Sequence, residues 1–211
     1  MSVLAGIDYS MTCPSICIHD NPEEDEQFSI DNCSFFFATD SKKYAKRYLS
    51  GKITGSIMES KYTFENDIAR YMALADLFME LIETEDVTEV GLEDYAFAAK
   101  GQVFNIGENT AMLKSSLYQN QIPFFKFAPS QIKKFATGKG NANKNAMYEA
   151  FYNETAWDLK NIMSYNKKSI DSPIGDIVDS YYICKYLFHW GVEGGHDGNE
   201  RTLIETIENT I

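Results

Sequence analysis

The order of the hydrophobic segments constrains the fold of this 211-residue chain more than any other feature. Residues 3–7 form a near-continuous apolar run, which predicts a buried strand, and further strand-like runs follow at 15–20 and 33–38. The connections between these runs are short. We therefore expect the three segments to form an antiparallel meander.

Beyond this meander, helix-like and strand-like segments alternate. Apolar residues recur at helical spacing over 63–84 and over 103–117, and strand-like segments follow at 87–93 and 122–128. Strands that alternate with helices are expected to lie parallel to the first strand. The sequence thus predicts an α/β fold with a five-stranded mixed sheet, three strands antiparallel and two parallel, flanked by helices.

Three further helices are predicted at 129–136, 141–152 and 172–190. Each begins at a helix-start signal. These signals are Pro129, Asn141 and the pair Ser172-Pro173.

Two internal segments lack a clear period. Residues 41–61 are expected to form a basic loop or an irregular helix, and residues 153–171 are polar and ambiguous. We assign residues 1–190 to one domain, since the chain is short for two. Residues 191–211 are an acidic C-terminal tail.

The net charge of −12 argues against nucleic-acid binding only if charge is averaged over the molecule. Residues 41–61 hold six basic residues and one acid, and residues 126–144 hold five lysines and no acid. Local basic faces decide phosphate contact, so either segment could bind a nucleic acid. The alternative is that these lysines only keep a surface soluble.

The sequence contains no apolar stretch long enough to span a membrane and no secretion signal. We therefore expect no membrane partner and a cytoplasmic location, in the host cytoplasm if a phage encodes the chain. The four cysteines form no C-x-x-C pair, and the three histidines have no zinc-like spacing. We expect the cysteines to be small buried residues in a reducing compartment.

Four carboxylates carry the chemistry that the sequence predicts. Asp8 closes the first strand and Glu93 closes the strand at 87–93, while Asp176 and Asp179 are neighbours on one flank of the last helix. If the fold gathers these acids, their charges are unfavourable unless cations neutralise them. Divalent metals bind Asp and Glu oxygens, and paired metals suit phosphodiester cleavage. The pattern favours a metal-dependent nuclease.

Each acid also has an ordinary structural interpretation. Asp8 could be a turn residue, and the helical pair could be a capping acid and a surface acid. If Ser172 caps the last helix, however, neither aspartate is needed as a cap.

Four motifs of this chain resemble, in order, motifs of the RuvC family of Holliday-junction resolvases, within the RNase H-like superfamily. The first is similar to the family's opening G-I-D-x-S/G strand, and the second to its acid followed by an aromatic residue and a lysine. The third resembles P-x-x-V-K-K…G-x-G-x-A-x-K, and the fourth resembles D-x-x-D. They occupy residues 6–10, 93–100, 128–144 and 176–179.

The resemblance implies an RNase H-like fold and a metal-dependent endonuclease that cuts symmetric strands of a four-way DNA junction as a homodimer. It implies catalytic residues that bind two Mg²⁺ (or Mn²⁺) ions per active site. By position these are Asp8, Glu93, Asp176 and Asp179.

The same resemblance implies which residues bind DNA. Lysines that contact the phosphate backbone are expected in the second and third motifs, and an aromatic residue at the junction centre is expected in the second. These residues are Lys100, Lys133, Lys134, Lys139, Lys144, Tyr95 and Phe97. The helix at 103–117 corresponds to the helix that forms the family's dimer, although its apolar stripe could equally pack on its own sheet.

The long segments 41–61 and 153–171 and the acidic charge depart from the family, and they indicate a divergent, phage-type member. Two alternatives stay open. One is another RNase H-like nuclease that acts on branched replication DNA or RNA–DNA hybrids, and another is a non-catalytic nucleic-acid-binding protein of this fold. A kinase related to actin shares the opening motif but needs two such domains, for which the chain is too short.

Overall fold

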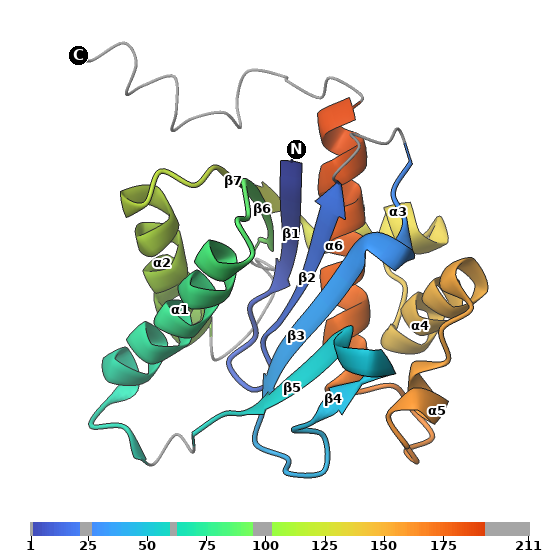
Figure 1. Cartoon of the computed structure of the whole chain (residues 1–211), viewed down its shortest axis with the longest axis horizontal. Coiled ribbons are helices and arrows are strands. Elements are labelled where there is room, and N and C mark those ends of the chain that lie inside the picture. Colours follow the sequence, from blue (N-terminus) through green and yellow to red (C-terminus); the bar gives the residue numbers. More distant parts are fainter. Residues whose placement is uncertain (1, 22–26, 60–62, 95–102, 193–211) are drawn as a thin grey trace.

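The computed structural model describes residues 2–21, 27–59, 63–94 and 103–192, which form a mixed sheet with helices on both faces (Figure 1). The strand order is β4-β5-β3-β2-β1-β6-β7. The strands are β1 (Ser2–Asp8), β2 (Ser15–Asn21), β3 (Cys33–Thr39), β4 (Arg47–Tyr48), β5 (Ile53–Ile57), β6 (Glu89–Glu93) and β7 (Phe124–Phe127).

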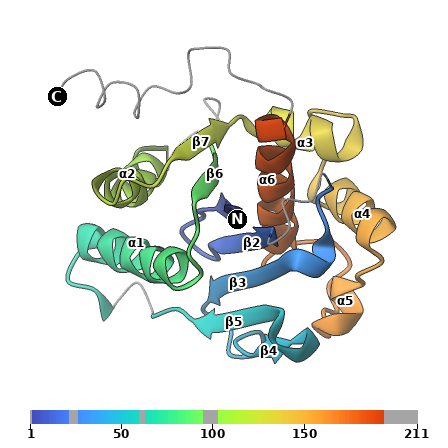
Figure 2. The ribbon, with the colours of Figure 1, turned by 45° about the horizontal axis from the view of Figure 1, so that its top comes forward.

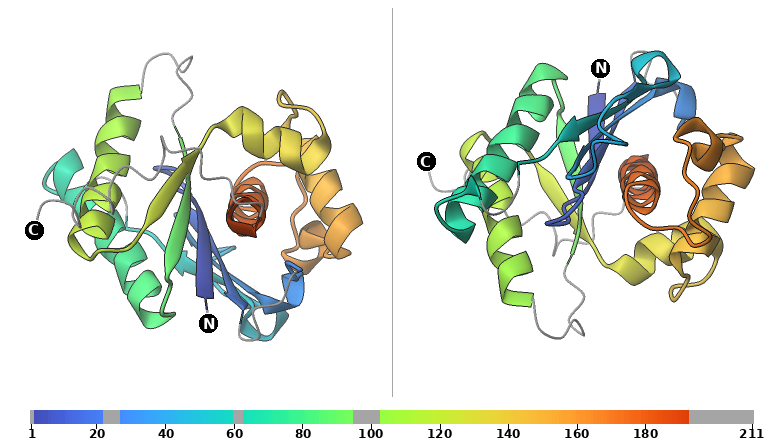
Figure 3. Two further views of the ribbon diagram at one scale, coloured as in Figure 1. Left: turned by 90° about the horizontal axis from the view of Figure 1, so that it is seen from above. Right: turned by 90° about the horizontal axis from the view of Figure 1, so that it is seen from below.

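The helices divide between the two faces of the sheet. One face is covered by α1 (Asp67–Thr84) and α2 (Val103–Gln119), and the other by α6 (Ile174–Val192), with α3 and α4 packed outside it (Figure 3). The remaining elements are α3 (Pro129–Thr137), α4 (Lys144–Thr155), α5 (Leu159–Ile162) and the 3₁₀ turns η1 (Ile30–Asn32) and η2 (Leu49–Gly51). No helix in the described ranges is both long and apolar enough to cross a membrane.

The predicted α/β class and the predicted strand directions are confirmed. Strand β2 runs antiparallel to β1 and β3, whereas β6 runs parallel to β1 and β7 runs parallel to β6. These five strands are the sheet that the alternation of segments predicted.

The predicted number of strands was wrong, because the sheet has seven strands and not five. The two additional strands come from segment 41–61, which we expected to be a loop or an irregular helix. Strand β5 pairs parallel with β3, and β4 pairs antiparallel with β5. The segment is anchored by the buried side chains of Tyr44, Tyr48 and Ile53. These three residues are too few to produce a clear period in the sequence.

Several predicted boundaries move by a few residues. Asn66 caps α1, and Asn143, not Asn141, caps α4. Helix α6 begins at Ile174, one residue after Pro173, and the Ser172–Pro173 peptide bond is cis. The predicted acidic tail lies, from residue 193 on, outside the described residues.

The contact between β1 and α6 is unusually close because it occurs at a glycine. A Cβ atom at Gly6 would overlap the backbone nitrogen of Cys184 and the backbone oxygen of Ser180, both in α6. On either side of Gly6, Ala5 and Ile7 point to the opposite face and pack in the core beneath α1 and α2. Only a residue without a side chain lets α6 lie directly on β1.

We predict that Gly6→Ala destabilises the protein by about 3 kcal/mol or more, since the added methyl group meets backbone atoms that cannot rotate away. Urea unfolding monitored by circular dichroism measures this loss. Gly107→Ala in α2 is the matched control, because a Cβ there meets no atom within 4 Å. We expect the control to be neutral or slightly stabilising. Equal stability of the two variants would contradict the close β1–α6 contact.

Candidate active site

The topology brings the ends of β1 and β6 together. The two strands are parallel neighbours in which Ile7 is paired with Leu92, so the next residues, Asp8 and Glu93, leave the sheet side by side. Helix α6 begins at the same edge, which is the lower edge in Figure 1, with Asp176 in its first turn. Asp179 follows one turn later on the same flank. All four predicted carboxylates therefore lie at one edge of the sheet.

The pKa shifts of the acids are those of a crowded, poorly hydrated group of carboxylates. Burial raises the pKa of Asp8 well above its ordinary value. The negative charges of Asp176, Asp179 and Glu93 raise that pKa further. Burial also raises the pKa of Glu93, and burial together with the charge on Glu93 raises the pKa of Asp179 to about 7. Bringing these groups together in their ionised form therefore requires a counter-charge.

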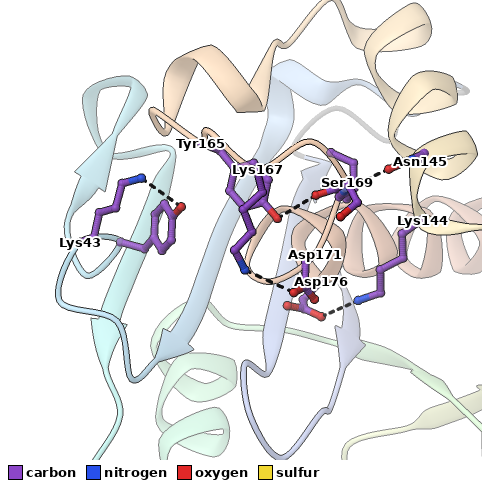
Figure 4. A network of polar contacts seen from close by, with 10 residues as sticks. Lys43, Lys144, Asn145, Tyr165, Lys167, Ser169, Asp171 and Asp176 are labelled. Atoms are coloured by element: carbon purple, nitrogen blue, oxygen red, sulfur yellow. Dashed lines mark hydrogen bonds and ion pairs between the residues drawn. The ribbon is translucent and has the colours of Figure 1, made fainter.

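Lys144 supplies part of that counter-charge. Its ammonium nitrogen lies 3.3 Å from Oδ1 of Asp176, whose side chain is only 4% exposed (Figure 4). The side chain reaches this position across Gly175, where a Cβ atom would lie 3.0 Å from Nζ of Lys144. Burial lowers the pKa of Lys144, but the charges of Asp176, Asp179 and Asp8 raise it more, so the net shift is upward.

A hydrogen bond to its backbone holds Asp176 in place, but only one of its two carboxylate oxygens has a hydrogen-bond partner among the described residues. The hydroxyl of Ser15 donates a hydrogen bond to the backbone oxygen of Asp176, which links β2 to the first turn of α6. Oδ2 of Asp176 is buried and has no hydrogen-bond partner among the described residues. A buried carboxylate oxygen without a donor is unfavourable unless a donor or a cation approaches it.

The donor set fits a divalent cation in its chemistry. Carboxylate oxygens are the preferred ligands of Mg²⁺ and Mn²⁺, and the raised pKa values and the open oxygen of Asp176 show where positive charge is needed. Within the described ranges, however, no three His, Cys, Asp or Glu side chains are already arranged to hold a metal ion. The acids share one edge, and Lys144 is paired with one of them, Asp176, and attracted by the charges of Asp179 and Asp8.

The predicted DNA-contacting lysines divide into two groups. Lys133 in α3 and Lys144 lie within electrostatic reach of the carboxylates, because each opposes the rise in the pKa of Glu93 and Asp179. Lys134 and Lys139 are exposed at the end of α3 and in the turn that follows. The remaining predicted contacts, Tyr95, Phe97 and Lys100, lie outside the described residues.

The sequence did not reveal the ion pair between Lys144 and Asp176 or the roles of Ser15 and Gly175. Lys144 was predicted only as a phosphate contact. Gly175 was visible directly before the first acid of the helix, but its use, a passage for the lysine side chain, needs the position of α4. The four cysteines are buried free thiols, as predicted.

Comparison with known proteins finds one family model and several solved structures of similar fold. The family model for crossover junction endodeoxyribonuclease RuvC matches residues 52–153. The structure of Thermus thermophilus RuvC aligns with a TM-score of 0.56 and 13% sequence identity, covering 91% of this chain and 96% of that one. The T. thermophilus RuvC complex with a Holliday junction substrate aligns equally well, with a TM-score of 0.56, 13% identity, and 93% and 98% coverage. The yeast mitochondrial Holliday junction resolvase Ydc2 aligns with a TM-score of 0.54 and 15% identity, covering 94% of this chain and 82% of that one.

The sheet order and the helix layers define an α/β protein of the RNase H-like class, which confirms the predicted fold class. The family match and the shared fold also confirm the resemblance found in the sequence. The match to the family model covers just under half of the chain, and the solved structures show that the fold is shared.

We predict that, without divalent ions, the carboxylate cluster lowers the stability of the protein as the pH rises. Asp179 titrates near pH 7 in the folded state against an ordinary value of 3.8, so the folded state binds this proton more tightly than the unfolded state. Its contribution to the free energy of unfolding is present below about pH 4 and is lost as the pH rises to about 7. Asp179→Asn should therefore stabilise the protein at pH 8 by about 1 to 3 kcal/mol.

Thermal and urea unfolding in a chelator, from pH 5 to pH 8, measure this effect. Asp171→Asn is the matched control, because Asp171 is exposed at the same edge and its pKa is lowered, first by a hydrogen bond from the Ser172 backbone. That substitution should not stabilise the protein. An Asp179→Asn protein no more stable than wild type at pH 8 would show that the carboxylates are not crowded.

Proposed function

We propose that this chain is a metal-dependent endonuclease that resolves four-way DNA junctions by hydrolysing phosphodiester bonds in symmetric strands. The observation that carries the proposal is the convergence of Asp8, Glu93, Asp176 and Asp179 at one edge of a RuvC-like fold. The fold alone hosts several activities, so this convergence of acids is what favours a nuclease. Solved relatives with the same fold include a RuvC bound to a Holliday junction substrate.

The four carboxylates would hold two Mg²⁺ or Mn²⁺ ions. Such ions, when bound, lower the pKa of the attacking water and stabilise charge on the phosphate and on the leaving 3′ oxygen. The open Oδ2 of Asp176 and the raised pKa of Asp8 support this assignment. The short span of backbone between Asp176 and Asp179 keeps two of these ligands on one rigid helical turn.

Lys144 and Lys133 would act on the substrate. Lys144, whose ammonium group is paired with Asp176 at this edge, would bind a non-bridging phosphate oxygen of the substrate. Lys133 lies near the same acids and can hold the neighbouring phosphate. Lys134 and Lys139, which are exposed at the end of α3 and in the turn that follows, would contact the backbone away from the cut.

We also propose that the protein acts as a homodimer, as symmetric cleavage of two strands requires. Large apolar side chains are exposed on the face formed by α1 and α2, which suits a subunit interface. They are Ile68, Met72, Phe104 and Tyr118, and Phe104 is 84% exposed. The proposed junction contacts of Tyr95, Phe97 and Lys100 stay predictions.

We predict that Asp8→Asn and Asp179→Asn each bind a labelled four-way junction but nick it more than about 100-fold more slowly with Mg²⁺, since each removes a metal ligand. Asp94→Asn is the matched control. Asp94 follows Glu93 directly but lies 3.9 Å from Lys126, and we do not place it among the ligands. The control should cleave at the wild-type rate.

A flap and an RNA–DNA hybrid, tested beside the junction, report the substrate preference. Junction cleavage that survives in both variants would contradict the proposed mechanism. Cleavage of the hybrid or the flap in preference to the junction would contradict the proposed substrate.

A further inference from the structure

Two segments that are distant in the sequence form one surface beside the carboxylates. These are the loop at residues 40–47, between β3 and β4, and residues 160–171, which lead from α5 into α6. The ammonium group of Lys43 donates a hydrogen bond to the backbone oxygen of Ser164 at 2.8 Å. The buried rings of Tyr44 and Tyr165 pack beneath this contact, with centroids 6.1 Å apart. Figure 2 shows α5 beside β4 and β5, as this docking requires.

This surface is basic in an acidic protein. The two segments contain seven basic residues and two acids, although the whole chain has a net charge of −12. One of the acids, Asp171, is paired with Lys167 at 3.3 Å. We call the seven basic residues the basic rim. They are Lys42, Lys43, Lys46, Arg47, Lys160, Lys167 and Lys168.

Tyrosine rings support several of these cations. The ammonium groups of Lys43 and Lys46 lie 4.8 Å and 5.4 Å from the ring centroids of Tyr44 and Tyr48. Lys160 lies over Tyr148 at 5.4 Å, and Lys167 lies over Tyr165 at 5.8 Å. Side chains held in this way lose less freedom on binding a ligand than free lysines do. These contacts favour a binding surface over lysines that only keep the protein soluble.

The position of the rim relative to the active site follows from the sheet. Strands β1 and β3 both run antiparallel to β2, so the loop after Thr39 leaves the same edge as Asp8. The second segment is tied to the site directly, because the backbone nitrogen of Ile170 donates to Oδ1 of Asn145 at 2.8 Å. Asn145 adjoins Lys144, which contacts Asp176, and Figure 4 shows Lys43, Lys167 and the Lys144–Asp176 pair in one field.

We propose that the basic rim binds the phosphate backbone of a duplex DNA arm, beyond the bond that is cut, as that arm passes over the loop at 40–47 and the segment at 160–171. Clustered cations beside a phosphodiester-cleaving site suit the phosphates of a DNA backbone, which carry one negative charge each. This inference rests on the proposed nuclease function. It adds a contact surface built from residues 40–47, which lead into the additional strand β4, and from the segment at 160–171.

Neutralising the rim tests the proposal. We expect Lys42→Gln and Lys168→Gln each to lower the slope of log K against log salt by about 1, and the double variant to lower it by about 2. The double variant should bind a long-armed junction several-fold more weakly and raise the KM for its cleavage several-fold, with kcat unchanged. A junction with arms too short to reach the rim should bind wild type and the double variant equally.

Two controls separate charge from structure. Lys52→Gln removes one lysine that is not part of the rim. Lys52 lies directly before β5 and donates to the backbone oxygen of Asp31, so this variant should leave the slope unchanged. The double Lys42→Arg, Lys168→Arg variant keeps both charges and should restore wild-type binding. Circular dichroism and thermal unfolding report whether each variant is folded.

The outcomes distinguish this proposal from the proposed function. If the double Gln variant keeps the wild-type affinity and salt slope while the junction is still cut, the rim proposal is overturned and the nuclease assignment stands. If the wild-type protein cuts no junction, the proposed function fails. Binding to plain duplex DNA then still tests the rim, and an unchanged salt slope there would overturn it as well.

Discussion

The contact of α6 with β1 at Gly6 is the constraint on which the site depends. The absence of a side chain there lets the helix backbone lie against the strand backbone. One result is that the first turn of α6, with Asp176 and Asp179, begins next to the end of the strand that carries Asp8. A larger residue at position 6 would push the helix outward and separate the acids. The packing of α6 on β1 therefore builds part of the core and also determines the positions of the acids in the candidate site.

This arrangement places stability and function in opposition. Carboxylates that have lost hydration repel one another, and burial is the largest cause of the raised pKa values of Asp8, Glu93 and Asp179. Lys144 offsets part of this repulsion through its ion pair with Asp176. Such a pair is weak evidence for stability, since burying both charges is itself unfavourable. Its significance is that the lysine supplies positive charge to the acids at which divalent ions are proposed to act.

The sequence was sufficient to predict the class of fold and the candidate acids. Strand directions followed from the order of segments, because parallel neighbours need a crossover helix and antiparallel ones do not. The four acids could be found in the sequence because two of them stand at the ends of strand-like segments. The other two are neighbours on one flank of a predicted helix. The two additional strands were missed because β4 has only two residues and β5 buries only Ile53 and Gly55. A pattern that short gives no reliable period.

The details of the site could not be predicted from the sequence, because they depend on how the helices are placed in space. Asn141 and Asn143 are equally good caps by residue type, and only the position of α4 shows that Asn143 is used. The Lys144 side chain reaches Asp176 by lying across Gly175. The spacing of these residues along the chain does not predict this contact. The docking of the loop at 40–47 on residues 160–171 joins two segments that we had treated as unrelated departures from the family.

The most direct test of this account is anomalous diffraction from crystals of the protein soaked in Mn²⁺. The account predicts Mn²⁺ bound by oxygens of Asp8, Glu93, Asp176 and Asp179, with the ammonium group of Lys144 moved away from Asp176. Crystals in which saturating Mn²⁺ leaves these carboxylates without a metal and the Lys144–Asp176 pair intact would contradict it.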